Sequence, residues 1–116
     1  MKTYLSVTKA LADESRTRIL KLLETGELCV CQIQAVLGLG QSTVSKHLSV
    51  LKQAGLVEIR KDGIWIYHLL NPQPEGYALT FLASLKDWLN KDAQVLADRD
   101  KLAEVKAVEL RDLCKK

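Results

Sequence analysis

The fold is decided by residues 26–55, which read GELCVCQIQAVLGLGQSTVSKHLSVLKQAG. Apolar residues at helical spacing run up to a tight turn, Gly38-Leu39-Gly40, and the polar Gln41-Ser42-Thr43 behind the turn can cap a second helix. A helix, a glycine turn and a second helix together make a helix-turn-helix. The stretch therefore predicts a helix-turn-helix at about residues 31–54.

A β-hairpin is predicted directly after this unit. Residues 56–59 and 64–67 are rich in β-forming side chains, and Asp62-Gly63 between them is a preferred hairpin turn. Asn71-Pro72-Gln73-Pro74 ends the second strand, since proline donates no hydrogen bond to a sheet. A hairpin that follows a helix-turn-helix is a wing, so a wing is expected at about residues 56–70.

Further helices are predicted on both sides. Residues 3–12 have apolar positions at helical spacing, and Asp13 stands where the cap of a second helix belongs. That second helix is expected to keep its basic residues outside: Arg16, Arg18 and Lys21. Residues 75–114 are predicted to form one or two C-terminal helices, with Asp92 able to cap the last. The fold class is therefore mainly α with a small β-hairpin, a winged helix-turn-helix in a single domain of residues 1–116.

The charge of the chain is unevenly distributed. Its net charge is +3, and residues 1–63 hold nine Lys and Arg against six Asp and Glu, which leaves eight of each for the rest. The basic excess therefore lies in the half with the helix-turn-helix, as a phosphate-binding surface requires. No apolar run approaches the roughly 18 residues of a membrane span, and no signal peptide opens the chain. We expect a cytoplasmic protein with no membrane partner.

The second helix of the helix-turn-helix is predicted to read double-stranded DNA. On a helical wheel its apolar side chains share one side with His47, while short polar and basic side chains occupy the other and can enter a major groove. The competing interpretation is an ordinary solvated helix face, or for Arg60 and Lys61 an ordinary charged turn. His47 and His68 are interpreted as partly buried structural histidines rather than metal ligands. The predicted DNA contacts are Gln41, Ser42, Thr43, Ser45, Lys46 and Ser49, with Arg60 and Lys61 on the wing.

The cysteine pair Cys29-Val30-Cys31 is the second chemical signal. The two thiols are open to three interpretations: small buried hydrophobic residues, a redox pair, or donors to a soft ion. A nearby helix N-terminus would stabilise their thiolates. Residues i and i+2 point about 200° apart on a helix but to one side of an extended segment. One ion can therefore bind both sulfurs only if this segment is extended or is pulled out of helix.

Cys114 is the other sulfur donor of the chain, and it is either an incidental terminal cysteine or a further ligand. Two thiolates alone do not complete a four-coordinate zinc site, and a trivalent thiophilic ion that takes three sulfurs fits better. No nucleophile with a base, and no phosphate-cradling loop, argues for an enzyme. No organic cofactor is expected.

These motifs resemble the ArsR/SmtB family of winged-helix repressors. The resemblance lies in LADESRTRILKLL at residues 11–23, ELCVC at 27–31, QSTVSKHL at 41–48, GLV at 55–57 and the hairpin that follows, and it covers about residues 5–70. ELCVC is similar to the arsenic-responsive ArsR branch. The resemblance implies a homodimer through the first and last helices, a palindromic operator, and DNA release when As(III) or Sb(III) binds Cys29 and Cys31.

The sequence also departs from that branch at one ligand position. Gln34 stands where the arsenic branch commonly has a further cysteine, which leaves Cys114, water or an added thiol as the third ligand. The histidines of the family's zinc site are absent after residue 75. The alternatives to metalloid sensing are a repressor whose cysteines form a redox or persulfide switch and, more remotely, a thiol oxidoreductase or metal-delivery protein.

Overall fold

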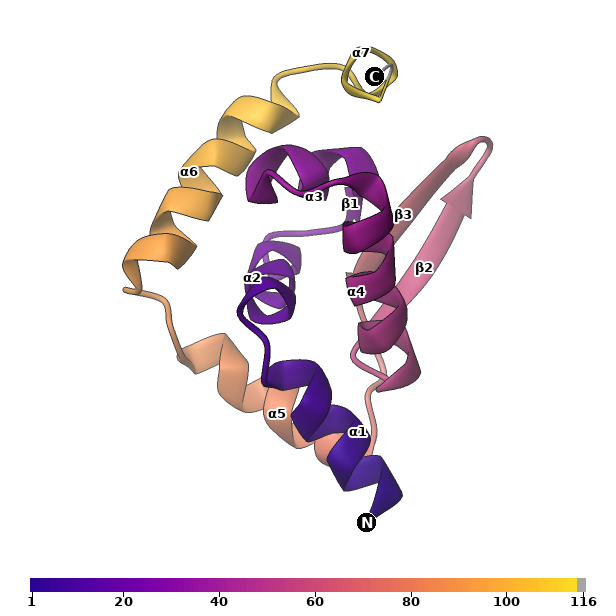
Figure 1. The fold of residues 1–116 in the computed structure, drawn as a ribbon, viewed down its shortest axis with the longest axis vertical. Helices are drawn as coiled ribbons and strands as arrows, with labels where there is room; N and C mark the ends of the chain where they lie inside the picture. The colour runs from indigo at the N-terminus through magenta and orange to yellow at the C-terminus, as the bar shows by residue number, and fades with distance from the viewer. Residues whose placement is uncertain (115–116) are drawn as a thin grey trace.

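The computed structural model describes residues 1–114, which form a group of helices with a small antiparallel sheet at one edge (Figure 1). The predicted fold class, mainly α with a winged helix-turn-helix, is confirmed. The elements in chain order are α1 (Lys2–Leu11), α2 (Glu14–Leu23), β1 (Leu28–Cys29), α3 (Val30–Leu37), α4 (Gln41–Gln53), β2 (Val57–Asp62), β3 (Trp65–Leu70), α5 (Gly76–Asp87), α6 (Ala93–Lys106) and α7 (Leu110–Leu113).

The helix-turn-helix is formed by α3 and α4. Gly38 ends α3 with φ of 72°, a left-handed conformation that glycine adopts without steric cost, and its N–H donates to the Gln34 carbonyl at 2.8 Å. The chain thereby reverses within Gly38-Leu39-Gly40 and enters α4 at Gln41. The buried side chains of α4 pack into a common core with those of α1, α2 and α3.

The wing is the predicted hairpin, but its turn is Gly63-Ile64 rather than the predicted Asp62-Gly63, because Asp62 still pairs with Trp65. The sheet also has a third strand. β2 and β3 pair from Val57–Leu70 to Asp62–Trp65 around the turn Gly63-Ile64. β1 adds to the outer side of β3, with Leu28 opposite His68 and Cys29 opposite Tyr67, so the strand order is β1-β3-β2. The segment before α3 is therefore extended up to Cys29, and helical from Val30 onward.

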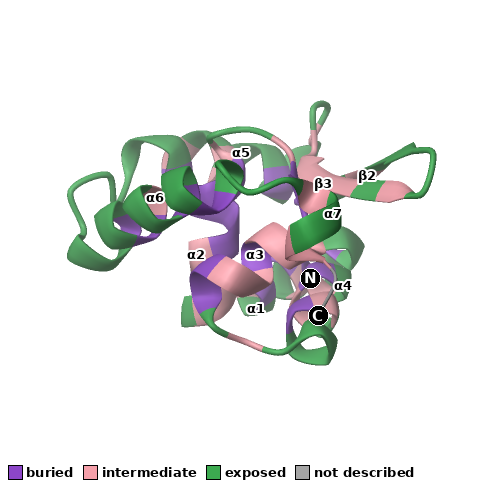
Figure 2. Cartoon of the chain, turned by 90° about the horizontal axis from the view of Figure 1, so that it is seen from above, coloured by how far each residue is buried: buried purple, intermediate pink, exposed green. Residues whose placement is uncertain are grey.

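The core lies between the helix-turn-helix and the helices on either side of it (Figure 2). α5 runs beside α1, whereas α6 turns back and packs on α2 and α3. Asp92, the predicted cap, begins α6 by accepting hydrogen bonds from the N–H groups of Gln94 and Val95 at 3.0 and 3.1 Å. The residues with essentially no exposed surface are Val7, Ala10, Ile19, Leu20, Leu28, Ile33, Val44, Leu51 and Leu56.

The basic side of α2 was predicted to face solvent, and for Lys21 that prediction is wrong. Lys21 is buried, and its Nζ donates to the Leu85 carbonyl at 2.8 Å and to Asn90 Oδ1 at 3.0 Å while pairing with Glu24 at 2.8 Å. A buried ammonium is tolerated when its donors are all used in this way. The helical pattern of α2 cannot reveal that the end of α5 and the start of α6 cover its polar side.

A second buried charge pair fastens α6 to α2. Arg18 donates from Nε and one Nη to the two carboxylate oxygens of Asp98, at 2.8 and 2.9 Å, and Asp98 is only 4% exposed. Gln94 donates to the same carboxylate at 2.8 Å. An ion pair whose hydrogen-bonding groups all have partners holds a fixed geometry, because removing either residue would leave the other charge buried without a partner.

The change Asp98→Ala is expected to lower the free energy of unfolding by about 3 kcal/mol, because it leaves the Arg18 guanidinium partly buried without its carboxylate. Asp100→Ala, on the exposed side of the same helix, is the matched control and is expected to change stability by less than about 0.5 kcal/mol. Urea unfolding measures both. Equal stability of the two variants would contradict the anchoring role of the Arg18–Asp98 pair.

Candidate nucleic-acid interface and thiol pocket

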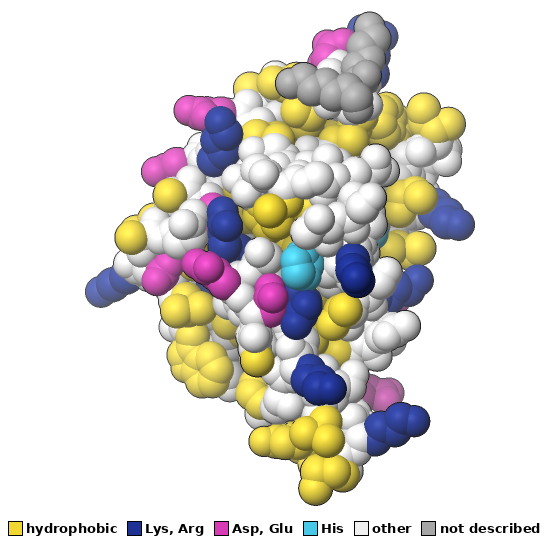
Figure 3. All heavy atoms as spheres, in the orientation of Figure 1, with side chains coloured by type: hydrophobic (Ala, Val, Ile, Leu, Met, Phe, Trp, Pro, Cys, Tyr) yellow, Lys and Arg dark blue, Asp and Glu magenta, His cyan; other side chains and the backbone are white. Residues whose placement is uncertain are grey.

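The outward face of α4 carries the predicted reader residues. Val44, Leu48 and Leu51 are buried, so α4 presents its opposite side outward, where Gln41, Ser42, Thr43, Lys46 and Ser49 are exposed and Ser45 is partly exposed. Figure 3, in the orientation of Figure 1, shows several Lys and Arg side chains spread over this face of the molecule. Short donors and acceptors flanked by Lys suit contact with base edges and phosphates.

His47 has a structural partner, in agreement with its interpretation. Its Nδ1 lies 3.3 Å from Nη1 of Arg16, and the same guanidinium donates to the carbonyls of Ala10 and Lys9 at 2.9 and 3.0 Å. Arg16 thus connects the reader helix to the end of α1. His68 is half-buried in β3, and burial, with a smaller effect of Lys52, holds its pKa below the ordinary value.

The two basic residues of the wing differ in their surroundings. Arg60 Nε donates to Glu27 Oε1 at 2.9 Å, a second bond joins Arg60 to the other carboxylate oxygen, and the guanidinium lies 4.6 Å from the centre of the Tyr67 ring. These bonds hold the pKa of Glu27 below its usual value. Lys61, one residue further out, is exposed. Arg60 is therefore tied to the segment that precedes the cysteine pair, while Lys61 extends toward solvent.

Cys29 occupies the junction between β1 and α3. It is buried, and its backbone N–H donates to Oε1 of Gln32 at 2.9 Å. Burial, and next the charge of Glu27, raises the pKa of the Cys29 thiol. The expected stabilisation of a thiolate by the helix N-terminus is outweighed here, because desolvation disfavours the charged form.

Cys31 and Cys114 are brought together, although 83 residues separate them. Their sulfur atoms are joined as a disulfide, and their Cα atoms lie 5.4 Å apart. Cys31 lies in the first turn of α3, and Cys114 directly follows α7, which packs on α3. The C-terminal cysteine therefore reaches the cysteine pair within one chain, whereas Cys29 is the free thiol.

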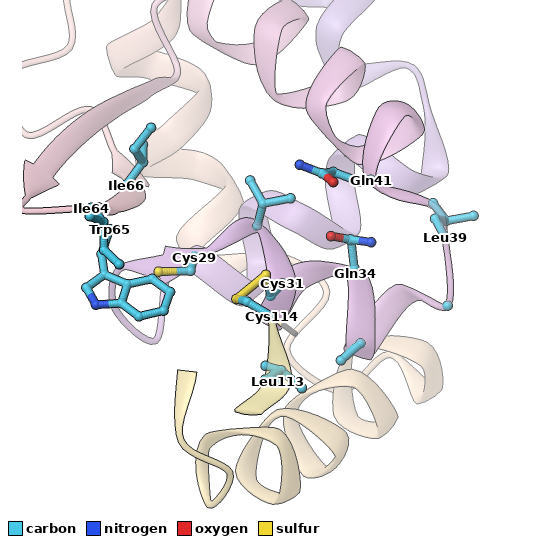
Figure 4. A pocket seen from close by; sticks show the side chains of 13 residues that line it. Cys29, Cys31, Gln34, Leu39, Gln41, Ile64, Trp65, Ile66, Leu113 and Cys114 are labelled. Atoms are coloured by element: carbon cyan, nitrogen blue, oxygen red, sulfur yellow. A yellow bond between two sulfur atoms is a disulfide. The ribbon is translucent and has the colours of Figure 1, made fainter. Parts of the chain in front are cut away.

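All three cysteines line one pocket of about 670 Å³ (Figure 4). The other walls come from the wing, the α3–α4 turn and α7. Within residues 1–114 no three His, Cys, Asp or Glu side chains are grouped closely enough to hold a metal ion in this conformation. Once reduced, the thiols are soft donors suited to thiophilic ions. The sequence interpretation missed Trp65, Leu39 and Leu113 as parts of this site, because their patterns indicated only a strand, a turn and a helix.

The pocket is bordered by both the predicted reader helix and the wing. Gln41, the first residue of α4, lines it on one side, and Ile64, Trp65 and Ile66 line it from the wing. The pocket therefore extends from the cysteines to both the first turn of α4 and the wing. None of the helices in residues 1–114 combines the length and apolarity needed to cross a membrane.

Residues 13–58 match the family described as bacterial regulatory protein, arsR family. The arsenic resistance transcriptional regulator ArsR1 of Pseudomonas putida is 38% identical over 97 residues, which cover 79% of this chain and 76% of that protein. The arsenical resistance operon repressor of Escherichia coli is 44% identical over 71 residues, which cover 60% of this chain and 61% of the relative.

The fold is shared with a solved structure of the same kind. A homodimeric winged helix-turn-helix DNA-binding domain from Mycobacterium bovis, a possible ArsR-family transcriptional regulator, matches with a TM-score of 0.64 and 30% identity. The match covers 79% of this chain and 82% of that domain. The chain belongs to the ArsR family of bacterial regulatory proteins, which are winged-helix DNA-binding transcriptional regulators rather than enzymes.

Proposed function

We propose that this protein is a cytoplasmic transcriptional repressor that binds operator DNA as a homodimer and leaves it when trivalent arsenic or antimony binds its cysteines. One observation carries the proposal: a single pocket is lined by Cys29, Cys31 and Cys114, by the first residue of the reader helix and by the wing. The names of the Pseudomonas putida and Escherichia coli relatives, which concern arsenic resistance, support the choice of ligand.

The proposed DNA interface consists of the outward face of α4 in a major groove and the wing beside it. Hydroxyl and amide groups of the reader would contact base edges, and Lys46 and Lys61 would contact phosphates. Arg60 is proposed to contribute from the wing while it holds Glu27.

The proposed dimer interface lies on α1 and the C-terminal helices. Tyr4 and Leu5 of α1 and Tyr77 and Leu79 of α5 are exposed apolar side chains, and the rings of Tyr4 and Tyr77 stack edge to face with centroids 5.4 Å apart. A contiguous apolar surface of this kind is typical of a protein–protein interface. Two copies joined there would present two reader helices to a palindromic operator.

Cys29, Cys31 and Cys114 are the proposed ligands. Trivalent arsenic and antimony prefer sulfur donors, and a bound ion would join three segments that now meet at the pocket wall. With Gln34 unable to supply sulfur, Cys114 takes the third position. All three sulfurs must be thiols for this, so the Cys31–Cys114 disulfide has to be reduced before the ion can bind.

The coupling between the cysteines and DNA follows from where each cysteine is attached. Cys29 pairs with Tyr67 of the wing strand, and Cys31 lies in the helix that supports α4 through the turn at Gly38. Drawing their sulfurs toward one ion changes the extended-to-helical junction at Val30, because residues two apart share a side only in extended chain. The strain would reach the wing through β1 and the reader through α3.

Replacement of Lys46 by Ala is expected to weaken operator binding about tenfold and to reduce the slope of log affinity against log salt by about 0.9 per protomer, because one phosphate contact is lost. Lys106→Ala, on the exposed side of α6, is the matched charge control and should change neither quantity. Fluorescence anisotropy with a labelled operator at several salt concentrations measures both. An unchanged salt slope for Lys46→Ala would remove this residue from the interface.

Arsenite is expected to release the reduced wild-type protein from its operator, while Cys29→Ser, Cys31→Ser and Cys114→Ser stay bound at the same arsenite concentration. Release is expressed relative to each variant's own affinity without arsenite, so a change in DNA binding by itself does not count. Antimonite is tested in parallel. If arsenite and antimonite both leave the wild-type complex intact, metalloid sensing is wrong for this protein.

A redox switch is the second candidate, and the Cys31–Cys114 disulfide favours it. Hydrogen peroxide would accept two electrons from the two thiols, whose S–H bonds break as the S–S bond forms, and would be converted to two molecules of water. The product fastens α7 to the first turn of α3. In that state neither sulfur can bind arsenic, so oxidation and metalloid binding exclude each other at this site.

Peroxide treatment is expected to join Cys31 to Cys114 and to leave Cys29, which shares the tryptic peptide 22–46 with Cys31, as a thiol, because Cys29 is buried and lies outside the bonded pair. Non-reducing peptide mapping detects the linked peptides, fragmentation of these peptides shows whether Cys29 or Cys31 is bonded, and anisotropy compares operator affinity of the reduced and oxidised forms. A chain that remains fully reduced, or equal affinities of the two forms, would rule out a redox switch.

A further inference from the structure

The thiol pocket is much larger than an inorganic ion requires. Arsenite has four heavy atoms and, at about 30 Å³ for each water it would displace, needs on the order of 100 Å³. The pocket, which is open to solvent on one side, has a volume of about 670 Å³. Most of the pocket therefore lies beyond the reach of an arsenic atom bonded to the cysteines.

The remaining space is lined mainly by hydrocarbon. The wing contributes Ile64, Trp65 and Ile66, and the helical side contributes Val30, Leu39 and Leu113. Two glutamine amides are the polar side chains among the described lining residues, and none of these residues carries a charge. The indole of Trp65 extends from the wing toward the cysteines (Figure 4). A pocket with aromatic and aliphatic walls and few polar groups is suited to an apolar ligand.

Cys31 and Cys114 provide a bidentate anchor at the edge of this apolar space. Their sulfurs are close enough to be bonded, so after reduction both can bond to one common atom. Trivalent arsenic makes three bonds, and two neighbouring thiols fill two of them. The third can remain a bond to carbon if the ligand already carries a hydrocarbon group.

We propose that this pocket selects trivalent arsenicals bearing one hydrocarbon group, preferably aromatic, which Cys31 and Cys114 bind through arsenic and Trp65 contacts through the ring. This rests on the proposed function, because it takes trivalent arsenic as the ligand and specifies its substituent. The binding step is a ligand exchange: two S–H and two As–OH bonds break, two As–S bonds form, and two molecules of water leave. The carbon–arsenic bond and the oxidation state do not change.

The test compares two arsenicals that form the same two As–S bonds and differ only in the hydrocarbon, phenylarsine oxide and methylarsonous acid. The reduced protein competes with dithiothreitol for each compound, and the protein adduct is quantified by native mass spectrometry. Dithiothreitol binds each compound through As–S bonds alone. Comparing the protein with dithiothreitol therefore cancels any difference between the two compounds in the strength of those bonds. We expect the ratio of phenyl to methyl adduct to be at least tenfold higher for the protein than for dithiothreitol. The double variant Cys31→Ser and Cys114→Ser leaves Cys29 as a single thiol and is expected to lose both adducts.

Trp65→Ala is expected to reduce the preference for the phenyl compound to that of dithiothreitol, whereas Trp88→Ala, at an exposed tryptophan outside the pocket, keeps it. Ile64→Ser is a second pocket variant that cannot unfold the wing, because Ile64 is 86% exposed, and it should lower the preference several-fold. A wild-type preference equal to that of dithiothreitol, or one unaffected by both pocket changes, overturns the inference.

The two proposals fail separately. One outcome is that arsenite releases the operator while the protein shows no greater preference for the phenyl compound than dithiothreitol does. In that case the substituent preference is wrong and metalloid sensing stands. If the phenyl compound binds with the expected preference and neither it nor arsenite releases the operator, the pocket is an arsenical site and the proposed regulation is wrong. If no arsenical binds the reduced thiols, both are wrong.

Discussion

The bond between Arg18 and Asp98 is the contact on which the position of the C-terminal part depends. The two charged groups are largely removed from water and form hydrogen bonds with each other. The pair therefore favours the orientation of α6 on α2 in which both charges keep their partner. Lys21 and Glu24 extend the same contact to the end of α5 and to Arg99. With α6 held there, α7 follows onto α3, and Cys114 arrives at Cys31.

The short strand β1 has the corresponding role on the other side of the site. It consists of Leu28 and Cys29, pairs with the wing strand, and passes directly into the helix that supports the reader. The Glu27–Arg60 bond reinforces this junction at the base of the wing. The cysteine pair therefore lies where the wing sheet and the helix that precedes α4 are connected.

Much of the DNA-binding half could be predicted from the sequence. The glycine turn, the capping Asp13, the Asp-Gly hairpin and the apolar side of α4 are local patterns, and each depends on residues a few positions apart. The reader face is likewise a local property, since helical periodicity alone separates Val44 and Leu48 from Ser42 and Ser49. Lys21 shows the limit: its burial depends on a helix more than sixty residues away, which no periodicity in α2 records.

The sequence by itself determined the family of fold, the helix-turn-helix, the wing and the presence of a thiol pair, because these follow from short-range spacing and from the chemistry of each side chain. Only the tertiary structure decided which sulfurs meet and what surrounds them. The partner of Cys31 is Cys114, which reaches it because α6 turns back along α2, and Trp65 faces the thiols because β1 joins the wing sheet. Both contacts result from packing between residues far apart in the sequence, and together they place the cysteine pair in the wall of a pocket.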